Sequence, residues 1–198
     1  MLTHGAGTNA DAPLLVALAE AFGAVGLSVL CYELPFRRAR PTGPPSPAGA
    51  AADREGLRHA VGSVRARVAG HVYLGGHSYG GRQASILAAS EPGLADALLL
   101  LAYPLHPPRR PGERRTAHFT ELRTPALFVH GSRDPFGSLD ELEAARHLVP
   151  ARTALLAVDG AGHDLRLPGP RGATVAVTIA EAFACFVAPG DGTPGDGA

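Results

Sequence analysis

The part of this sequence best suited to covalent chemistry is the glycine-rich segment 75–81, GGHSYGG, which follows an apolar run and opens a helical pattern. A serine on a sharp turn from a strand into a helix has the setting of a nucleophile elbow, in which the hydroxyl is presented to a substrate carbonyl. Such a turn strains the serine backbone, and side chains in place of the flanking glycines would collide with the neighbouring strand and helix. Free N–H groups at a helix start also face developing negative charge. We therefore predict Ser78 as nucleophile and the Tyr79 N–H as one oxyanion donor.

Two further residues have the order and spacing that a serine nucleophile needs. Asp134 stands in the run HGSRDP just after one predicted strand, and His163 stands in GAGHD just after the next. A chain order of nucleophile, acid and base, each at a strand end, brings the three side chains to one edge of a parallel sheet. We predict Asp134 as the acid and His163 as the base. Two alternatives stay open: Asp134 as the start of a turn before Pro135, and His163 as an ordinary surface histidine.

Other acids and histidines are less well placed. Asp140 falls inside a predicted helix, and Asp159 ends its strand four residues before His163. We interpret His4, His77 and His130 as hydrogen-bonded structural histidines. His77 directly precedes the serine, so its side chain is expected to point away from the nucleophile.

A second oxyanion donor is predicted near the N-terminus. The run HGAGTN at 4–9 follows a short apolar stretch and precedes a helical pattern, which matches a His-Gly-x loop and assigns the second donor to the Ala6 N–H. The same stretch admits an alternative, because Gly5, Gly7 and Ala10 with Glu33 imitate a dinucleotide-binding fingerprint. That alternative is weaker, since its leading strand is nearly absent and it leaves the serine, acid and histidine pattern unexplained.

The wider pattern predicts one α/β domain with a mostly parallel sheet, helices on both faces and no cap domain. The expected strands are 27–32, 71–74, 97–102, 126–130 and 154–158, and the expected helices are 12–25, 50–68, 81–90, 139–148 and 174–186. The domain should cover 1–188, followed by a disordered Gly- and Pro-rich tail at 189–198. The opening residues Met1-Leu2-Thr3 read as the end of a buried strand, so we expect either shortened or missing N-terminal strands or a misplaced start.

Composition excludes several classes of function. The 198 residues carry 18 basic and 18 acidic side chains, so no overall field attracts nucleic acid or an anionic membrane. All the basic residues are arginine, which excludes a P-loop because that motif needs lysine. No apolar run approaches the roughly 20 residues of a membrane helix, and the N-terminal residues show no charged segment followed by an apolar stretch, so we expect a soluble cytoplasmic protein.

No cofactor or metal is expected either. The nine histidines are scattered, with no metal-binding spacing. Cys31 and Cys185 lie far apart in apolar segments, and we predict two buried, reduced thiols.

Two loops are rich in proline and arginine, at 35–47 and 104–115. We interpret them as solvated loops. Because both follow predicted strand ends near the site, recognition of an anionic substrate group is an open alternative. The arginines concerned are Arg37, Arg38, Arg40, Arg109, Arg110, Arg114 and Arg115.

These motifs resemble a known family. The runs LTHGAG at 2–7, GHSYG at 76–80, YPLHPP at 103–108, LFVHGSRD at 127–134 and Gly162-His163 are similar to small α/β-hydrolase-like proteins related to the testis-expressed hydrolase-like protein and to dienelactone-hydrolase-type enzymes. The resemblance covers nearly the whole chain and implies the α/β-hydrolase fold.

Together the residues and the resemblance predict a serine hydrolase acting on a small ester, thioester or related acyl compound through an acyl-enzyme. The partner is then a small-molecule acyl substrate. A non-catalytic interaction module with the same fold is the alternative from another class.

Overall fold

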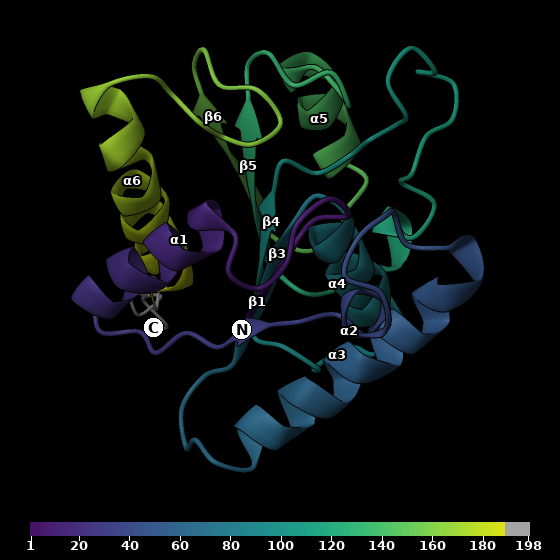
Figure 1. The fold of residues 1–198 in the computed structure, drawn as a ribbon, viewed down its shortest axis with the longest axis vertical. Helices are drawn as coiled ribbons and strands as arrows, with labels where there is room; N and C mark the ends of the chain where they lie inside the picture. The colour runs from purple at the N-terminus through teal and green to yellow at the C-terminus, as the bar shows by residue number, and fades with distance from the viewer. Residues whose placement is uncertain (189–198) are drawn as a thin grey trace, which may run out of the picture.

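The fold is a six-stranded sheet in which every pair of neighbouring strands is parallel (Figure 1). A computed structural model describes residues 1–188 of the chain, and the predicted tail at 189–198 lies outside the described residues. The strand order is β2-β1-β3-β4-β5-β6. The strands are β1 (Leu2–Thr3), β2 (Cys31–Tyr32), β3 (Tyr73–His77), β4 (Ala97–Leu101), β5 (Ala126–Gly131) and β6 (Thr153–Val158).

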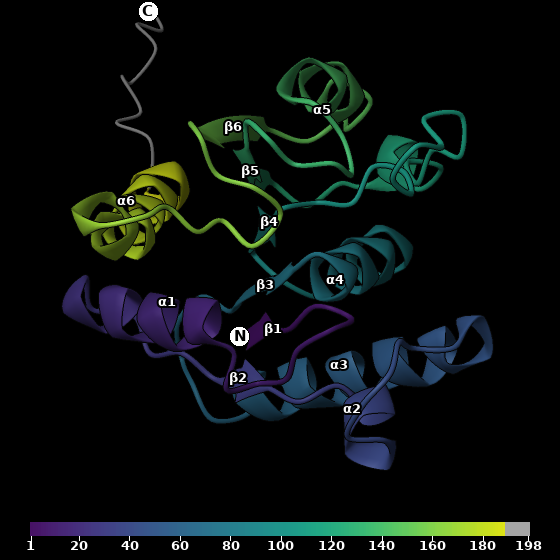
Figure 2. The same cartoon turned by 45° about the horizontal axis from the view of Figure 1, so that its top comes forward.

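Helices cover both faces of this sheet, as Figure 2 shows. They are α1 (Pro13–Ala24), α2 (Pro35–Ala39), α3 (Ala50–Arg65), α4 (Tyr79–Ser90), α5 (Leu139–Arg146) and α6 (Pro170–Val187). The helices α1 and α6 pack against one face, whereas α3, α4 and α5 contribute to the hydrophobic cluster on the other. The predicted architecture, a parallel sheet with helices on both faces and no cap domain, agrees with the structure of residues 1–188.

The central strand β4 explains why both faces must be covered. Its sequence ALLLL is buried throughout, with Leu98 and Leu100 in one cluster and Leu99 and Leu101 in the other. Successive side chains of a strand point to opposite faces, so a strand of continuous apolar residues is stable only between two layers of helices.

Most predicted elements agree with the structure to within a few residues, with one clear exception. The apolar run 27–32 was predicted as a strand, but only Cys31 and Tyr32 pair with a neighbour. Leu30 is 46% exposed, so the first part of the run lies outside the core. The predicted shortening of the first strand agrees with β1, whose two residues pair with β2 on one side and β3 on the other.

Two smaller predictions were wrong. Cys31 is only half-buried and Cys185 is exposed on α6, so the chain does not hold two buried thiols, although both cysteines are free. The loop at 35–47 is not irregular throughout, because its first residues form α2.

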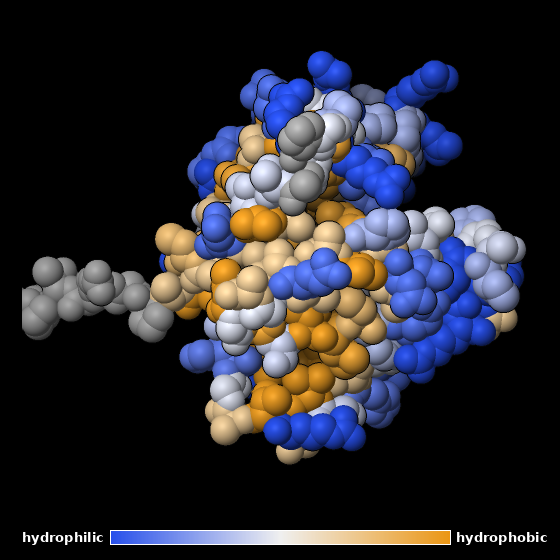
Figure 3. Space-filling model, turned by 60° about the vertical axis from the view of Figure 1, so that its left-hand side comes forward, coloured by the Kyte–Doolittle hydropathy of each residue, from blue (hydrophilic) through white to orange (hydrophobic). Residues whose placement is uncertain are grey.

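Hydrophobic side chains gather on the face that carries α1 and α6 (Figure 3). A hollow of about 380 Å³ lies near the amino end of β3 and has mainly apolar walls, with Met1, Leu27, Val68 and Phe183 among them. It contains none of the residues predicted to do chemistry. Within residues 1–188, no helix combines the length and apolarity needed to span a membrane.

Candidate active site

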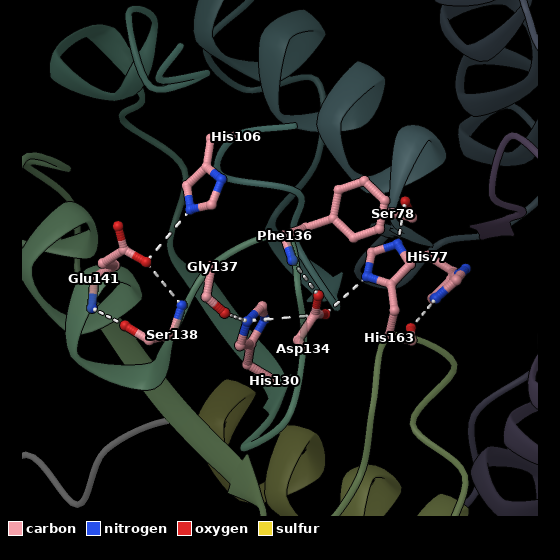
Figure 4. A network of polar contacts seen from close by, with 10 residues as sticks. All are labelled: His77, Ser78, His106, His130, Asp134, Phe136, Gly137, Ser138, Glu141 and His163. Atoms are coloured by element: carbon pink, nitrogen blue, oxygen red, sulfur yellow. Dashed lines mark hydrogen bonds and ion pairs between the residues drawn. The ribbon is translucent and has the colours of Figure 1, made fainter. Parts of the chain in front are cut away.

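The structure brings Ser78, His163 and Asp134 into one hydrogen-bonded chain (Figure 4). The Ser78 hydroxyl lies 2.8 Å from His163 Nε2, and His163 Nδ1 donates to Asp134 Oδ2 at 2.7 Å. Ser78 lies between β3 and α4, Asp134 just after β5 and His163 after β6. All three are therefore at the carboxyl edge of the sheet, where the sequence predicted them.

The backbone at Ser78 has the strain expected of an elbow. Its φ of 51° and ψ of −114° put a residue with a side chain in a sparsely populated region. The neighbouring glycines make the turn possible: a Cβ on Gly76 would lie 2.8 Å from the Gly81 nitrogen, and one on Gly80 would lie 2.7 Å from the Thr3 side chain. Such distances are too short for real Cβ contacts, so the turn requires glycine at both positions.

Asp134 is held in a defined orientation. Its side chain is fully buried, and its other oxygen, Oδ1, accepts the Phe136 N–H at 2.8 Å. The Phe136 ring also packs on His163, with ring centroids 4.2 Å apart. Asp134 and His163 are thus positioned by one short turn after β5. Sequence reasoning missed Phe136 because an aromatic residue in a turn carries no chemical signal.

The acid turn and the histidine loop approach each other closely at Gly131. The Arg133 N–H donates to the Ala161 carbonyl at 2.9 Å, and a Cβ on Gly131 would lie 2.6 Å from the Gly162 oxygen and nearer still to that of Ala161. The absence of a side chain at Gly131 therefore allows the two loops to come together.

The three histidines interpreted as structural are each hydrogen-bonded. His4 donates from Nδ1 to the Gly5 carbonyl and accepts the Leu34 N–H at Nε2. His130 donates from Nε2 to the Gly137 carbonyl at 2.8 Å. Burial lowers the pKa of His4 below the usual value, which is consistent with a neutral ring.

The sequence predicted that the His77 side chain points away from the nucleophile, but the structure places it at the site. Its ring lines the same cavity as Ser78, and Nε2 donates to the His163 carbonyl at 2.7 Å (Figure 4). A Cβ on Gly5 would lie 2.8 Å from His77 Nδ1, so the ring also packs on the N-terminal loop. Burial lowers the pKa of His77, and the neutral ring links the His163 loop to the loop at 4–9.

Both predicted oxyanion donors line the cavity beside Ser78. Tyr79 is the first residue of α4, and Ala6 lies in the loop after β1. Within residues 1–188, neither backbone N–H donates to another protein group. Two unused N–H groups beside a serine hydroxyl are what stabilisation of an oxyanion needs.

Arg37 corrects the interpretation of its loop as solvated. The side chain is 6% exposed, and its guanidinium donates to the backbone carbonyls of Ala6 and Thr8 at 2.7 and 3.0 Å. Three more bonds go to carbonyls in the segment after α2, those of Arg40, Pro41 and Gly43. Arg37 therefore fastens the loop that carries Ala6, whereas Arg38 and Arg40 are exposed.

A cavity of about 800 Å³ opens over Ser78 and His163. Its walls include prolines from both proline-rich loops and three arginines: Arg54 from α3, Arg82 from α4 and Arg115 from the segment after β4. The sequence singled out only Arg115, and as one of a cluster. Arg82 had a usable signal, since it lies four residues after Ser78 and so on the same side of the helix.

The dinucleotide alternative finds no support at the residues it needs. The Glu33 carboxylate, which would hold a ribose, accepts the Ala10 N–H at 2.8 Å. The described part of the chain also holds no group of three His, Cys, Asp or Glu side chains placed to bind a metal ion.

The parallel sheet and the serine, acid and histidine order define an α/β hydrolase. The chain belongs to this class: the family described as "Alpha/beta hydrolase domain" matches residues 1–188. It is therefore a hydrolase by family, and the resemblance seen in its motifs is confirmed.

Solved structures agree on the fold. A dienelactone hydrolase from Anabaena variabilis is 21% identical, with a TM-score of 0.70 over 93% of this chain and 84% of that one. Est1E from Butyrivibrio proteoclasticus is 15% identical, with a TM-score of 0.68 over 95% of this chain and 87% of that one. An alpha-beta serine hydrolase homologue from Coxiella burnetii is also 15% identical, with a TM-score of 0.68 over 94% and 84%.

Proposed function

We propose that this protein is a serine hydrolase that cleaves a small ester, thioester or related acyl compound through an acyl-enzyme. The observation that carries the proposal is the unbroken chain of hydrogen bonds from Asp134 through His163 to Ser78. A carboxylate that accepts from Nδ1 fixes the tautomer in which Nε2 is free to take a proton from the serine.

The reaction has two halves. His163 Nε2 takes the Ser78 proton as Oγ attacks the acyl carbon, and the negative oxygen is stabilised by the N–H groups of Tyr79 and Ala6. His163 then gives the proton to the leaving alcohol or thiol. In the second half it activates a water, which releases the acid and restores the serine.

The Phe136 ring and the buried Asp134 carboxylate restrict the His163 ring between these steps. Restricting a catalytic group to its reactive geometry lowers the barrier, because little reorganisation is left for the transition state. The cavity of about 800 Å³ suits a small substrate. As part of the proposal, the protein acts in the cytoplasm.

Labelling with a fluorophosphonate tests the proposal directly. The reagent reacts with a serine only where the nucleophile, base and oxyanion donors are assembled, so we expect one label per chain, at Ser78. Ser78→Ala should abolish labelling and lower kcat for 4-nitrophenyl esters by at least about 10³-fold.

The matched control is Ser63→Ala, because Ser63 is exposed on α3 and takes no part in the site. It should label and hydrolyse as the wild type does. If folded wild-type protein takes no label, the chain is better described as a non-catalytic module with a hydrolase fold. If Ser78→Ala keeps its esterase activity, the assignment of Ser78 as the nucleophile is wrong.

A further inference from the structure

Three arginine side chains line the cavity over Ser78, and among residues 1–188 no acidic side chain does. The whole chain has equal numbers of basic and acidic residues, so this is a local separation of charge. Arg54, Arg82 and Arg115 come from three different elements and meet only in the folded protein.

Their charges are not neutralised within residues 1–188. Elsewhere Arg58, Arg65 and Arg146 form ion pairs with carboxylates, but none of the three cavity arginines has a carboxylate oxygen within 4.0 Å. Arg54 donates to a neutral amide oxygen, that of Gln83, at 2.8 Å.

Arg82 is the centre of this arrangement. Its Nε is buried and has no hydrogen-bond partner among the described residues. A buried donor without a partner is costly. Arg82 also lines the cavity over Ser78, so its uncompensated charge acts on a ligand bound there.

The neighbours of Arg82 respond to its charge. Burial and then the Arg82 charge lower the pKa of Arg115, and the same two causes lower the pKa of His118 to about 4. The positive charge of Arg82 therefore acts on two groups in the segment between β4 and β5.

We propose that Arg82 and Arg115, assisted by Arg54, bind a carboxylate carried by the substrate, so that the preferred substrate is an ester or thioester with a free carboxylate. This inference rests on the proposed function. Guanidinium groups match a carboxylate with charge-assisted hydrogen bonds, and two half-buried arginines without acids are suited to it.

The carboxylate lies in the same cavity as the cleaved bond. Ser78, Arg82 and Arg115 all line this cavity, and the Arg82 N–H donates to the Ser78 carbonyl at 2.9 Å. Hydrolysis consumes one water and yields a new carboxylate, the alcohol or thiol and a proton. The proline-lined cavity and its volume favour a small molecule over a polymer.

Matched pairs of esters test the inference. One pair carries the charge on the acyl side, mono-4-nitrophenyl adipate against 4-nitrophenyl hexanoate, and the other on the alcohol side, 3-acetoxybenzoate against its methyl ester. In at least one pair we expect kcat/KM to be at least about tenfold higher for the carboxylate. Arg82→Gln and Arg115→Gln should each lower that ratio by about tenfold.

Arg109→Gln is the matched control, since Arg109 is exposed in the same segment as Arg115 and lies outside the cavity walls. It should leave the ratio unchanged. If Arg82→Gln does not fold, Arg115→Lys provides the second variant, and it should keep part of the preference because the charge remains. An equal loss on both members of a pair, or no preference in the wild type, would overturn the inference.

The two proposals fail in different ways. A protein that takes the fluorophosphonate label but has no carboxylate preference keeps the proposed function and loses the inference. If no labelling occurs, titration of the Ser78→Ala protein with monomethyl adipate and with methyl hexanoate still tests the subsite. At least tenfold tighter binding of the adipate, lost in Arg82→Gln, supports it, and equal or absent binding overturns it.

Discussion

Gly131 gives the sharpest test of how the base and the acid are brought together. It ends β5, and the carbonyls of Ala161 and Gly162 occupy the space where its side chain would be. Replacing it with alanine puts a methyl group 2.6 Å from the Gly162 oxygen, whereas ordinary contacts begin at 3.4 Å. The backbone carbonyls cannot swing aside as a flexible side chain would, so the histidine loop must move away from the acid turn.

The size of the effect follows from that distance. Restoring an ordinary contact with the Gly162 oxygen needs a shift of about 0.8 Å, and the nearer Ala161 oxygen needs a larger one. A displacement of about 1 Å at a catalytic group costs about 10²-fold in rate. The His163 to Asp134 distance of 2.7 Å would become too long for a strong hydrogen bond. We therefore expect Gly131→Ala to lower kcat by about 10²-fold, or about 2.7 kcal/mol, and to destabilise the fold by about 1–3 kcal/mol through overpacking.

The assay compares two alanine variants at 25 °C with a 4-nitrophenyl ester, alongside thermal unfolding by circular dichroism. The control is Gly162→Ala, because a Cβ at Gly162 has nothing within 4 Å although the residue belongs to the same pair of loops. Wild-type kcat in a folded Gly131→Ala protein, or an equal loss in Gly162→Ala, would refute the steric argument.

Two further predictions concern Arg37, which is buried, and His118, which is partly buried. A lysine at position 37 keeps the charge but cannot reach all the carbonyls that Arg37 binds, so Arg37→Lys should lower kcat by about tenfold with little change in KM. The control, Arg38→Lys, should leave both constants unchanged. A rise in KM alone in Arg37→Lys would contradict a role in fixing the Ala6 loop. For His118, burial lowers the folded pKa to about 4, so the unfolded chain takes up a proton first as the pH falls. The contribution of His118 to stability is full above about pH 6.5 and decreases toward pH 4. Tm measured between about pH 7 and about pH 4 should therefore fall less in His118→Gln than in the wild type. An equal fall in both proteins would refute the lowered pKa of His118.

The candidate site divides into a part that the sequence predicts and a part that it does not. Ser78, Asp134 and His163 each stand just past an apolar run, and parallel strands place such positions at one edge. Local patterns therefore suffice to bring them together. The elbow glycines could be predicted for the same reason, because the turn itself requires them.

The positions of the arginines in the fold could not be predicted from local sequence patterns. Arg37 sits in a run of prolines and arginines that looks solvated, yet carbonyls from two separate loops surround it in the fold. Arg54 and Arg82 have no motif, because the cavity they line exists only after α3 and α4 pack on the sheet. The strand expected at 27–32 was overextended, since apolar character does not specify which backbone groups find a pairing partner.

The origin of the arginines in different elements has a consequence for how such a protein diversifies. Arg54 and Arg115 belong to α3 and to the segment after β4, which supply no member of the Ser78, His163 and Asp134 chain. With the proposed function and subsite, substitution at those two positions changes which acyl compound is accepted and leaves the Ser78, His163 and Asp134 geometry unchanged. Selection can thus act on selectivity and on turnover as separate traits within one small domain.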